Sequence, residues 1–501
     1  MEPIVTPTQM RSIDQASTVA VDELIDRAGS AVARSAVSMM GGTYGRRVVV
    51  IVGPGNNGAD GRVAAARLVQ RGVGVSMVEA ASMDPEAPSL RLLIDRADLV
   101  IDAAYGTGLR SEFVAPDPGA TPVLAVDIAS GIDGLTGSLR GRAMHATATV
   151  SFAALKPGHL LGSGPEYAGI IEVADIGLDI GLGGVGPDSS LGESNSNVAL
   201  VTDHDAALAW PRRRVDAHKW NAAVWVIAGS PAMTGAPHLA CGAAMRAGAG
   251  YVRLSIPGAL PSRDGDIGPV EVVRVALPSS GWSQHLDDLG RVSAIVVGPG
   301  LGRVPSLVDD LSVLVDISGR TDISERTDSS GGTEWPPLVI DGDGLWALAA
   351  LIGSNPRGVS FSDRSVVLTP HDGEFQQLTG RNPGPDRIAE AASLAAMLDV
   401  TVLLKGGPTV VAGPDGSVRV VTSGDARLAT AGTGDVLSGV VGALLAQGLS
   451  PLDAGSIGAH VHGRAAALGP AHGFVASDLV DLVPEAVEAI MERPRPPRTL
   501  R

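Results

Sequence analysis

The sequence predicts an α/β protein with two domains, each a parallel sheet covered by helices. A chain of 501 residues exceeds what one hydrophobic core usually holds. Runs of β-branched residues alternate with helical segments in both halves. A glycine- and serine-rich stretch without periodicity separates the halves. We therefore expect a first domain over 1–182, a linker over 183–199 and a second domain over 200–501.

The N-terminal half begins with helical periodicity and continues as alternating strands and helices. Apolar residues recur at helical spacing over 8–40, which predicts one or two helices. The run RVVVIVG is continuously apolar, as expected of a strand buried on both faces. This βαβ series implies a three-layer αβα domain. Strands are predicted at 47–53, 74–79, 98–103 and 123–129, with a helix at 60–71.

The C-terminal half repeats this alternation and contains one polar insertion. The stretch 318–332 is rich in Ser, Asp and Gly, which predicts a disordered surface segment. Helices are predicted at 433–447 and 453–468. Strands are predicted at 223–229, 251–256, 294–298, 338–341, 365–370, 401–406 and 418–423.

Composition and charge exclude some classes of partner. Hydrophobic residues make up 45% and charged residues 18%, as in folded globular proteins. The net charge is -16, whereas a nucleic-acid-binding protein needs a basic face, so no nucleic acid is expected. A phosphate-bearing ligand must then be held by backbone N–H groups, helix N-termini and a few Lys or Arg side chains.

Cysteine content, apolar runs and the first residues together predict the cellular compartment. Cys241 is the sole cysteine, so the chain can form no internal disulfide. No run approaches the ~18 consecutive apolar residues of a membrane span. The first residues lack the basic-then-apolar pattern of a signal peptide. We expect a cytoplasmic enzyme with no membrane partner.

A glycine-rich loop follows the first predicted strand. The segment 53–61 reads GPGNNGADG and contains G-x-G-x-x-G directly between a strand and a helix. Glu79 closes the next strand, 21 residues after Gly58. This arrangement is typical of a Rossmann-like, dinucleotide-binding domain.

Polar side chains at the strand ends favour a more specific site. Asn56, Asn57 and Asp60 place oxygens on the loop and first helical turn, and such oxygens suit a hard cation. Asp102 and Asp127 follow later strands, whose carboxyl ends border the ligand crevice of an open α/β sheet. Because clustered carboxylates are costly without a cation or a shared proton, we expect a ligand site there.

These motifs resemble the YjeF N-terminal domain, an NAD(P)HX epimerase that acts on hydrated NADH and NADPH. The resemblance covers about 8–180 and is carried by GPGNNGADG, DAAYGTGL (102–109) and DIASG (127–131). It implies that Asp127 is the catalytic acid/base and that a lysine such as Lys156 contacts a phosphate. It implies potassium ligands at Asn57, Asp102 and Ser130. It implies substrate binding by Asn56, Asn57, Gly58, Ala59, Asp60, Gly106, Thr107, Gly108, Leu109, Arg110, Ser111, Glu112 and Asp127.

A second glycine loop, 431–439, is AGTGDVLSG and runs into an amphipathic helix. Such a loop points free N–H groups at an anion, aided by the helix dipole. Asp435 lies in the first turn, where it is placed to act as a base toward a group held by those amides. A plain helix cap is the alternative interpretation of Asp435.

This loop and several other motifs resemble the ribokinase-like superfamily. The match is nearest to the YjeF C-terminal domain, the ADP- or ATP-dependent NAD(P)HX dehydratase. It spans roughly 203–490. The motifs are HKW (218–220), IAGSPAMTGAPHLA (227–240), RAGAGYV (246–252), VGPGLG (297–302), DGDGL (341–345), LTPHDGEF (368–375), LKGGPT (404–409) and GTGDVLSG (432–439).

The resemblance implies roles for residues of the second domain. Asp435 would deprotonate the 6-hydroxyl of the hydrate for phosphorylation, after which phosphate leaves. Mg²⁺ is implied as the metal, with Asp341 or Asp343 as a candidate contact. The hydrated nucleotide would contact Gly250, Gly302, His371 and Asp435. The adenine nucleotide would contact Lys405, Gly406, Gly407, Pro408, Thr409 and Gly434.

The expected function is therefore repair of hydrated NADH and NADPH. The first domain would epimerise R and S hydrates. The second would dehydrate the S form at the expense of ADP or ATP, with release of AMP or ADP and phosphate. Small molecules would be the substrates and the protein a homo-oligomer. The alternative enzyme is a Rossmann oxidoreductase fused to a small-molecule kinase of the ribokinase superfamily. A third possibility is a first domain that binds nucleotides without catalysis.

Overall fold

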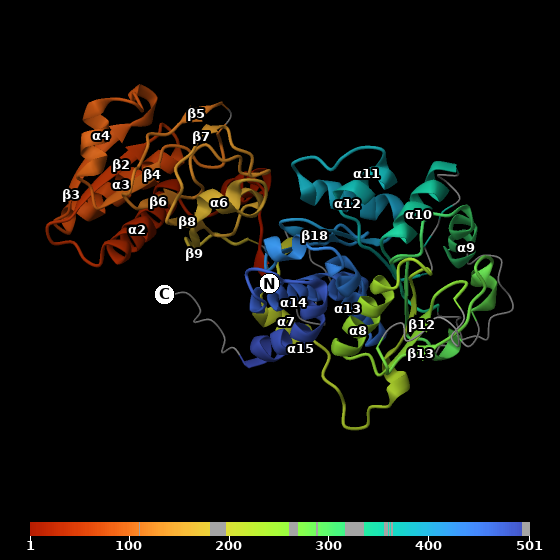
Figure 1. Cartoon of the computed structure of the whole chain (residues 1–501). Coiled ribbons are helices and arrows are strands. Elements are labelled where there is room, and N and C mark those ends of the chain that lie inside the picture. The colour runs from red at the N-terminus through yellow and green to blue at the C-terminus, as the bar shows by residue number, and fades with distance from the viewer. Residues whose placement is uncertain are drawn as a thin grey trace. The chain divides into compact units, whose positions relative to one another are not determined.

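The computed structural model describes residues 1–109, 111–180, 197–259, 269–286, 289–315, 335–354, 359, 361 and 364–492. The chain divides into two compact units, Glu2–Ala199 and Leu200–Pro496 (Figure 1). Arg110, most of the expected linker and all of the predicted insertion at 318–332 lie outside the described residues. Within the described residues, no helix has the length and hydropathy needed to span a bilayer.

The N-terminal unit is built on a parallel sheet with strand order β3-β2-β4-β6-β8-β9. The chain moves outward from β2 to β3 and then returns to the other side of β2 with β4. This reversal of direction is the point where open α/β sheets bind ligands. The elements are β1 (Glu2–Pro3), α1 (Pro7–Ala16), α2 (Val21–Met40), β2 (Arg47–Val52), α3 (Asn56–Gln70), β3 (Gly74–Glu79), α4 (Pro88–Asp95), β4 (Leu99–Ala103), β5 (Phe113–Val114), β6 (Val123–Val126), β7 (Gly141–Arg142), β8 (Ala148–Phe152), α5 (Pro157–Leu160), α6 (Gly164–Ala168) and β9 (Ile170–Ala174).

The continuous apolar run of β2 is explained by cover on both faces. Val48, Val50 and Val52 pack in the cluster that includes α2 and α3. Val49 and Ile51 pack in the cluster that includes α4. Because side chains alternate between the faces of a strand, a strand between two helix layers needs apolar residues at every position. The predicted three-layer αβα domain is confirmed.

The C-terminal unit contains a larger, mainly parallel sheet. Its strands run in the order β19-β18-β17-β16-β15-β14-β11-β12-β13, and only β18 pairs antiparallel to its neighbours in that series. The elements are β10 (Val198–Leu200), α7 (Asp203–Ala209), β11 (Ala223–Ile227), α8 (Gly235–Arg246), β12 (Tyr251–Ser255), β13 (Val273–Arg274), β14 (Ala294–Val297), α9 (Pro305–Val315), β15 (Leu338–Ile340), α10 (Asp343–Ser354), β16 (Val366–Leu368), α11 (Asp372–Thr379), α12 (Arg387–Leu398), β17 (Thr401–Leu404), β18 (Thr409–Ala412), β19 (Val418–Val421), α13 (Thr433–Ala446), α14 (Pro451–Leu468) and α15 (Ala476–Glu492).

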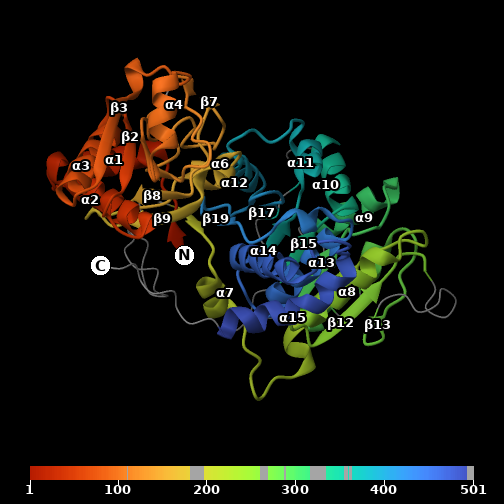
Figure 2. The same ribbon diagram turned by 60° about the vertical axis from the view of Figure 1, so that its left-hand side comes forward.

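Helices cover both faces of this sheet. One face packs against α8, α13, α14 and α15, with α13 lying between α8 and α14 (Figure 2). On the other face, α12 packs against β17 and β18. The α13 segment is buried along nearly its whole length, which explains why its sequence is apolar on all sides. The chain reverses its direction across the sheet between β11 and β14, so this pair marks the switch point.

Candidate active sites

The first glycine loop joins β2 to α3 at the switch point of the N-terminal unit. Gly53, Gly58 and Gly61 are required by packing: a Cβ there would lie 1.7 Å from Ala104 O, 1.9 Å from Gly53 O and 2.4 Å from the Ala103 Cβ, respectively. Gly55 differs, because no atom lies within 4 Å of a Cβ built on it. It caps α3 without a side-chain hydrogen bond. The open backbone at Gly55 is therefore the part of the loop suited to a ligand.

Glu79 is the acid that a Rossmann interpretation would place on a ribose. Its carboxylate instead accepts two hydrogen bonds from the Arg62 guanidinium, at 2.7 and 2.9 Å. Arg62 also donates to Gly53 O, at 3.0 Å. This ion pair connects α3 to β3. It engages the carboxylate that would bind the ribose in a dinucleotide-binding Rossmann domain.

Asp102, at the end of β4, is a fully buried carboxylate. Ser130 donates to it from its hydroxyl at 2.6 Å and from its backbone N at 2.9 Å. No cationic side chain of the described residues pairs with it, and burial raises the pKa of Asp102. Asn57 Nδ2 is likewise buried and has no hydrogen-bond partner in the described part of the chain. A buried acid and an unsatisfied amide next to a glycine loop mark a place for a ligand.

Asp127 follows β6 and reaches the same loop region. A Cβ on Gly106 would lie 3.3 Å from Asp127 Oδ2 and 3.2 Å from Asn57 Oδ1, so these two side chains flank Gly106. The Asp127 backbone is left-handed, with φ of 64°. Strand β6 therefore ends at Val126, earlier than the predicted 129.

Two groups of the loop after β8 hold Asp127. Lys156 Nζ lies 2.7 Å from Asp127 Oδ1. His159 Nε2 lies 2.8 Å from the Asp127 carbonyl oxygen. Burial raises the pKa of Asp127, but the neighbouring Lys156 ammonium, together with His159 and a hydrogen bond from the Phe152 backbone, outweighs this effect, so the pKa is below its ordinary value. Asp127 is thus an anion at neutral pH.

Asp60, on the second turn of α3, is buried and behaves in the opposite way. Burial raises the pKa of Asp60 to about 8, helped by the negative charges of Asp127 and Asp14. Asp14 comes from α1, and burial raises its pKa as well. Acids in opposite protonation states beside a ligand loop suit proton transfer in both directions.

The remaining residues predicted for this site lie between β4 and β6. The loop from Gly106 through Thr107, Gly108 and Leu109 continues directly from the carboxyl end of β4. Arg110 lies outside the described residues, whereas Ser111 and Glu112 precede β5. Thr107 faces the neighbouring turn, because a Cβ on Gly134 would lie 2.9 Å from Thr107 Cγ2. Their contact with a substrate remains a prediction.

In the C-terminal unit, α13 begins at the second glycine loop. Gly432 caps α13 in the left-handed conformation, with φ of 95°, and no side chain caps the helix. No described group accepts a hydrogen bond from the N–H groups of Gly434 and Asp435. His462 Nε2 lies 2.8 Å from Thr433 O, and this hydrogen bond fixes the start of α13. These free amides lie where the sequence predicts an anion site, and anion binding there stays a prediction.

Asp435 lies beside these amides among several charged groups. Burial, with the negative charges of Asp341, Asp343 and Glu374, raises the pKa of Asp435 to about 7, although the Lys405 ammonium lowers it. Asp435 is therefore balanced between its acid and base forms near neutral pH, which suits a general base. The alternative of a plain helix cap is not supported, because the Asp435 side chain makes no capping hydrogen bond.

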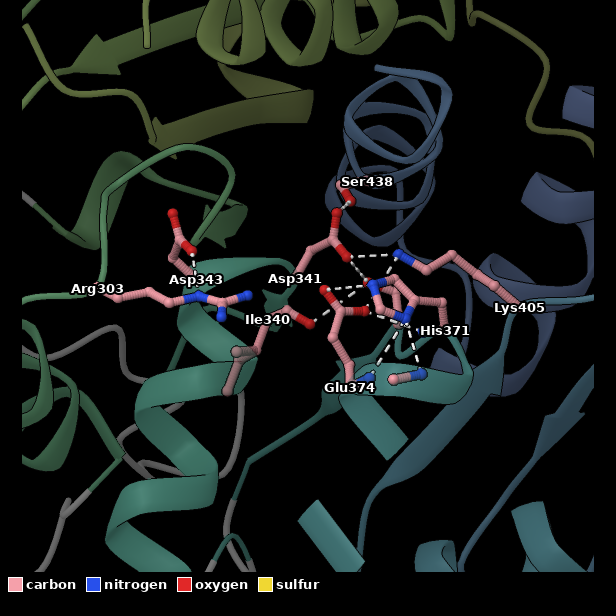
Figure 3. Close-up of polar contacts among 10 residues, drawn as sticks. Arg303, Ile340, Asp341, Asp343, His371, Glu374, Lys405 and Ser438 are labelled. Atoms are coloured by element: carbon pink, nitrogen blue, oxygen red, sulfur yellow. Dashed lines mark hydrogen bonds and ion pairs between the residues drawn. The ribbon is translucent and has the colours of Figure 1, made fainter. Parts of the chain in front are cut away.

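Lys405 connects this site to two acids (Figure 3). Its ammonium group lies 2.9 Å from Asp341 Oδ1 and 3.7 Å from Glu374 Oε2. A Cβ on Gly434 would lie 3.4 Å from Lys405 Nζ, so this ammonium borders the α13 amides. Asp341 also accepts hydrogen bonds from Thr369 and Ser438, at 2.7 and 2.6 Å. The cation is thus fixed next to the anion site.

Most of the other predicted residues follow strands at the carboxyl edge of the sheet. His371 caps α11 through Nδ1, which accepts from Gly373 N and Glu374 N at 3.0 and 3.2 Å. Gly302 N donates to Asp343 Oδ2 at 2.8 Å. Asp343 lies apart from Lys405 and its two acids (Figure 3). Gly406, Gly407, Pro408 and Thr409 connect β17 to β18 beside Lys405.

Gly250 is the exception among the predicted residues. It directly precedes β12 and donates to Ala222 O at 2.9 Å, so it lies at the amino edge of the sheet. The other predicted residues of this domain lie at or beyond the carboxyl edge. The structure does not bring Gly250 together with them, and its contact with substrate stays a prediction.

Sequence reasoning missed several residues that the fold brings to the sites. In the first domain these are Asp14 and His159, and in the second Glu374, Ser438 and His462. Glu374 stands three residues after His371 in the TPHDGEF motif, and that spacing was an available signal for a capping box. No local pattern distinguishes the other residues.

The fold and the two sites define a two-domain α/β enzyme with buried acids beside glycine loops at the carboxyl ends of its strands. Residues 224–487 match the family model described as NAD(P)H-hydrate dehydratase. Residues 21–88 and 79–158 match that of the YjeF-related protein N-terminus. The chain belongs to the family of bifunctional NAD(P)H-hydrate repair enzymes.

The relatives match almost end to end. The bifunctional NAD(P)H-hydrate repair enzyme of Salinibacter ruber is 34% identical over 92% of this chain and 91% of its own length. The enzyme of that name from Mycobacterium leprae is 36% identical over 88% and 87%.

Solved structures cover the extent of one domain. An ADP/ATP-dependent NAD(P)H-hydrate dehydratase from Bacillus subtilis, co-crystallised with ATP and Mg²⁺, is 27% identical over 59% of this chain and 99% of that chain, with a TM-score of 0.46. A ribokinase-like superfamily protein from Enterococcus faecalis is 21% identical over 61% and 100%, with a TM-score of 0.48.

Proposed function

We propose that this protein returns hydrated NADH and NADPH to their active forms in two steps. The N-terminal domain interconverts the R and S hydrates at C6. The C-terminal domain dehydrates the S form with ADP or ATP as the phosphoryl donor. Family membership supports the pairing of the two activities. The sites support the chemistry, because each offers a mostly buried carboxyl beside amides that suit phosphates.

In the epimerase step, Asp127 serves as the acid/base. C6 of the hydrate carries both a hydroxyl and the ring nitrogen, so inversion at C6 requires proton transfer at the hydroxyl. Asp127 is anionic because Lys156 lies 2.7 Å away, and it can accept that proton and return it. The open backbone at Gly55 and the uncapped start of α3 would bind phosphate oxygens.

A potassium ion fits the residues around Asp102. The Asp102 carboxylate is buried without a cationic partner, and the described residues hold no cluster of three acids, histidines or cysteines that would select a transition metal. Asn57, Asp102 and Ser130 would supply oxygen ligands, which suit a hard cation. When bound, the ion supplies positive charge that offsets the buried carboxylate.

In the dehydratase step, Asp435 removes the proton of the C6 hydroxyl. The hydroxyl oxygen then attacks the terminal phosphorus of ADP or ATP, and AMP or ADP leaves. Loss of the C6 phosphate with a proton from C5 restores the double bond. Hydroxide is a poor leaving group and phosphate a good one, which is why a nucleotide is consumed. The amides of Gly434 and Asp435, with Lys405, would steady the transferring phosphoryl group.

Magnesium fits this site as a nucleotide-borne ion. Both Asp341 oxygens are engaged, by Lys405, Thr369 and Ser438. The protein therefore offers few free carboxylates, and Mg²⁺ commonly uses phosphate oxygens, waters and one or two acids. Asp343 and Glu374 are the candidates for such a contact. The ion supplies neutralisation of phosphate charge.

The observation that carries the proposal is the position of Asp435 beside free amides and the fixed ammonium group of Lys405. The test is to incubate mixed R and S hydrate with ADP or ATP and Mg²⁺, and to follow absorbance at the reduced-nicotinamide band. We expect complete recovery of NAD(P)H, which requires both activities. Recovery that stops at the S fraction would refute the epimerase. Accumulation of a stable phosphorylated product would instead support a kinase.

A further inference from the structure

Lys156 is a lysine buried within the N-terminal domain, with only 1% of its side chain exposed. An ammonium group has three N–H donors. Lys156 Nζ lies 2.7 Å from Asp127 Oδ1, 2.9 Å from Ser151 Oγ and 2.9 Å from Phe152 O. All three donors are thus engaged by the protein. The phosphate contact implied by the resemblance does not fit this geometry, because no donor remains for it.

His159 fixes the backbone of the same aspartate. The backbone N of Lys156 donates to His159 Nδ1 at 3.1 Å, so the ring proton lies on Nε2 and is donated to Asp127 O at 2.8 Å. Burial lowers the pKa of His159 to about 4, so the ring is neutral. The left-handed backbone of Asp127 is strained for a residue with a side chain and needs such support. The loop after β8 therefore contacts both the side-chain carboxylate and the backbone carbonyl of Asp127.

Lys156 is the cation among the charged groups that face Asp127. Asp14 from α1 and Asp60 from α3 face the site as acids, while His159 is neutral and Lys156 is the cation. Burial raises the pKa of Asp14 and of Asp60. Only the carboxyl that touches Lys156 has a lowered pKa. Asp127, which contacts Lys156, is thus held in its ionised form, whereas Asp60 is held protonated at neutral pH.

Resting on the proposed epimerase activity, we infer that Lys156 is a positioning residue: its ammonium group holds Asp127 as the anion that acts as the base, and it touches no part of the substrate. His159 keeps the Asp127 carboxylate turned toward Gly106 by holding its backbone. The loop after β8 is therefore part of the proton-transfer machinery, although the substrate does not reach it.

The first test is Lys156→Met, which keeps the unbranched apolar part of the side chain and removes the ammonium group and its charge. We expect kcat for epimerisation to fall by at least ~100-fold while KM stays within about threefold, because a base is lost but no substrate contact. The acid limb of the kcat pH profile should move up by about one unit or more, since a close opposite charge is lost. A raised KM with unchanged kcat and limb would establish a phosphate contact and overturn the inference.

Controls separate this effect from misfolding and from failure of the proposed function. Asp26→Asn, at an exposed ion pair with Arg67 on the neighbouring helices, should keep wild-type rates. Absence of epimerisation in the wild type would refute the proposed function rather than the role of Lys156. If Lys156→Met fails to fold, carbon NMR titration of the wild-type carboxyls decides. Asp127 should then titrate below 3.8, ahead of Asp60, and an Asp127 protonated at neutral pH would overturn the inference.

Discussion

Asp341 and Lys405, at the ends of β15 and β17, are joined by a hydrogen bond of 2.9 Å from Lys405 Nζ to Asp341 Oδ1. The Asp341 side chain is 3% exposed and that of Lys405 is 21% exposed. A buried ion pair of this kind is costly to break from one side, because the remaining charge stays buried without a partner. The pair links the stability of the C-terminal domain to the site that we propose for the phosphoryl group.

Lys405→Met should therefore impair both stability and turnover. We expect a loss of ~3–5 kcal/mol in the free energy of unfolding of the C-terminal domain, since Asp341 loses its counter-charge. Chemical denaturation followed by near-ultraviolet circular dichroism measures it. The double variant Lys405→Met/Asp341→Asn should recover much of the stability without recovering dehydration. A single variant as stable as wild type would contradict the buried pair.

Asp435→Asn should abolish dehydration and leave nucleotide binding intact. The amide cannot accept the hydroxyl proton, so the rate should fall by at least ~100-fold. Calorimetric titration with ADP or ATP should give a dissociation constant within a few-fold of wild type. In the wild type, kcat should rise with pH through about 7, because the base is the ionised form and the pKa of Asp435 is about 7. Near-normal turnover in the variant would remove Asp435 as the base.

Asp127→Ala should stop epimerisation and spare the second domain. We expect the interconversion of R and S hydrates to slow by at least ~100-fold. Proton NMR of the two epimers follows the rate directly. Dehydration of pure S hydrate in the same sample provides the internal control. Unchanged interconversion would instead support a first domain that only binds nucleotides.

Asp60 should make the first domain less stable as pH rises. The folded pKa is about 8 and the ordinary value is 3.8, so the folded state holds a proton that the unfolded state has released. The contribution of Asp60 to the free energy of unfolding is therefore largest at low pH. It is lost as the pH rises toward about 8. Asp60→Asn should raise the melting temperature at pH 8 by about 3 °C or more and change it little near pH 4. An equal shift at both values would contradict a protonated Asp60.

Exchange of potassium should affect only the first domain. If Asp102 is balanced by the ion, replacing potassium with a bulky organic cation such as tetramethylammonium should slow epimerisation several-fold. Asp102→Asn, which removes the buried charge, should abolish the dependence on potassium. Titration of the epimerase rate with KCl measures both effects. A wild-type rate independent of potassium would argue against the site.

Local pattern predicted the α/β architecture but missed some strands. The apolar run of β2 indicated a strand covered on both faces, and the glycine loop at 431–439 indicated the start of a helix. The prediction that this helix is amphipathic was wrong, because α13 is buried along nearly its whole length. Strands β8, β9 and β18 went unpredicted, because they are short runs with Thr, Ser or Glu among the apolar residues. Their identity as strands depends on pairing with neighbours that are set by the rest of the sheet.

The sequence by itself determined the two α/β domains, the two glycine loops and the acids at the strand ends, since each depends on residues close together in the chain. Only the tertiary structure decided how these groups act. It brought Lys156 to Asp127, added Asp14 from α1, and left Gly250 at the far edge of its sheet. The physical reason is that a protonation state follows from burial and from charges contributed by distant segments, and neither quantity is encoded in a local pattern.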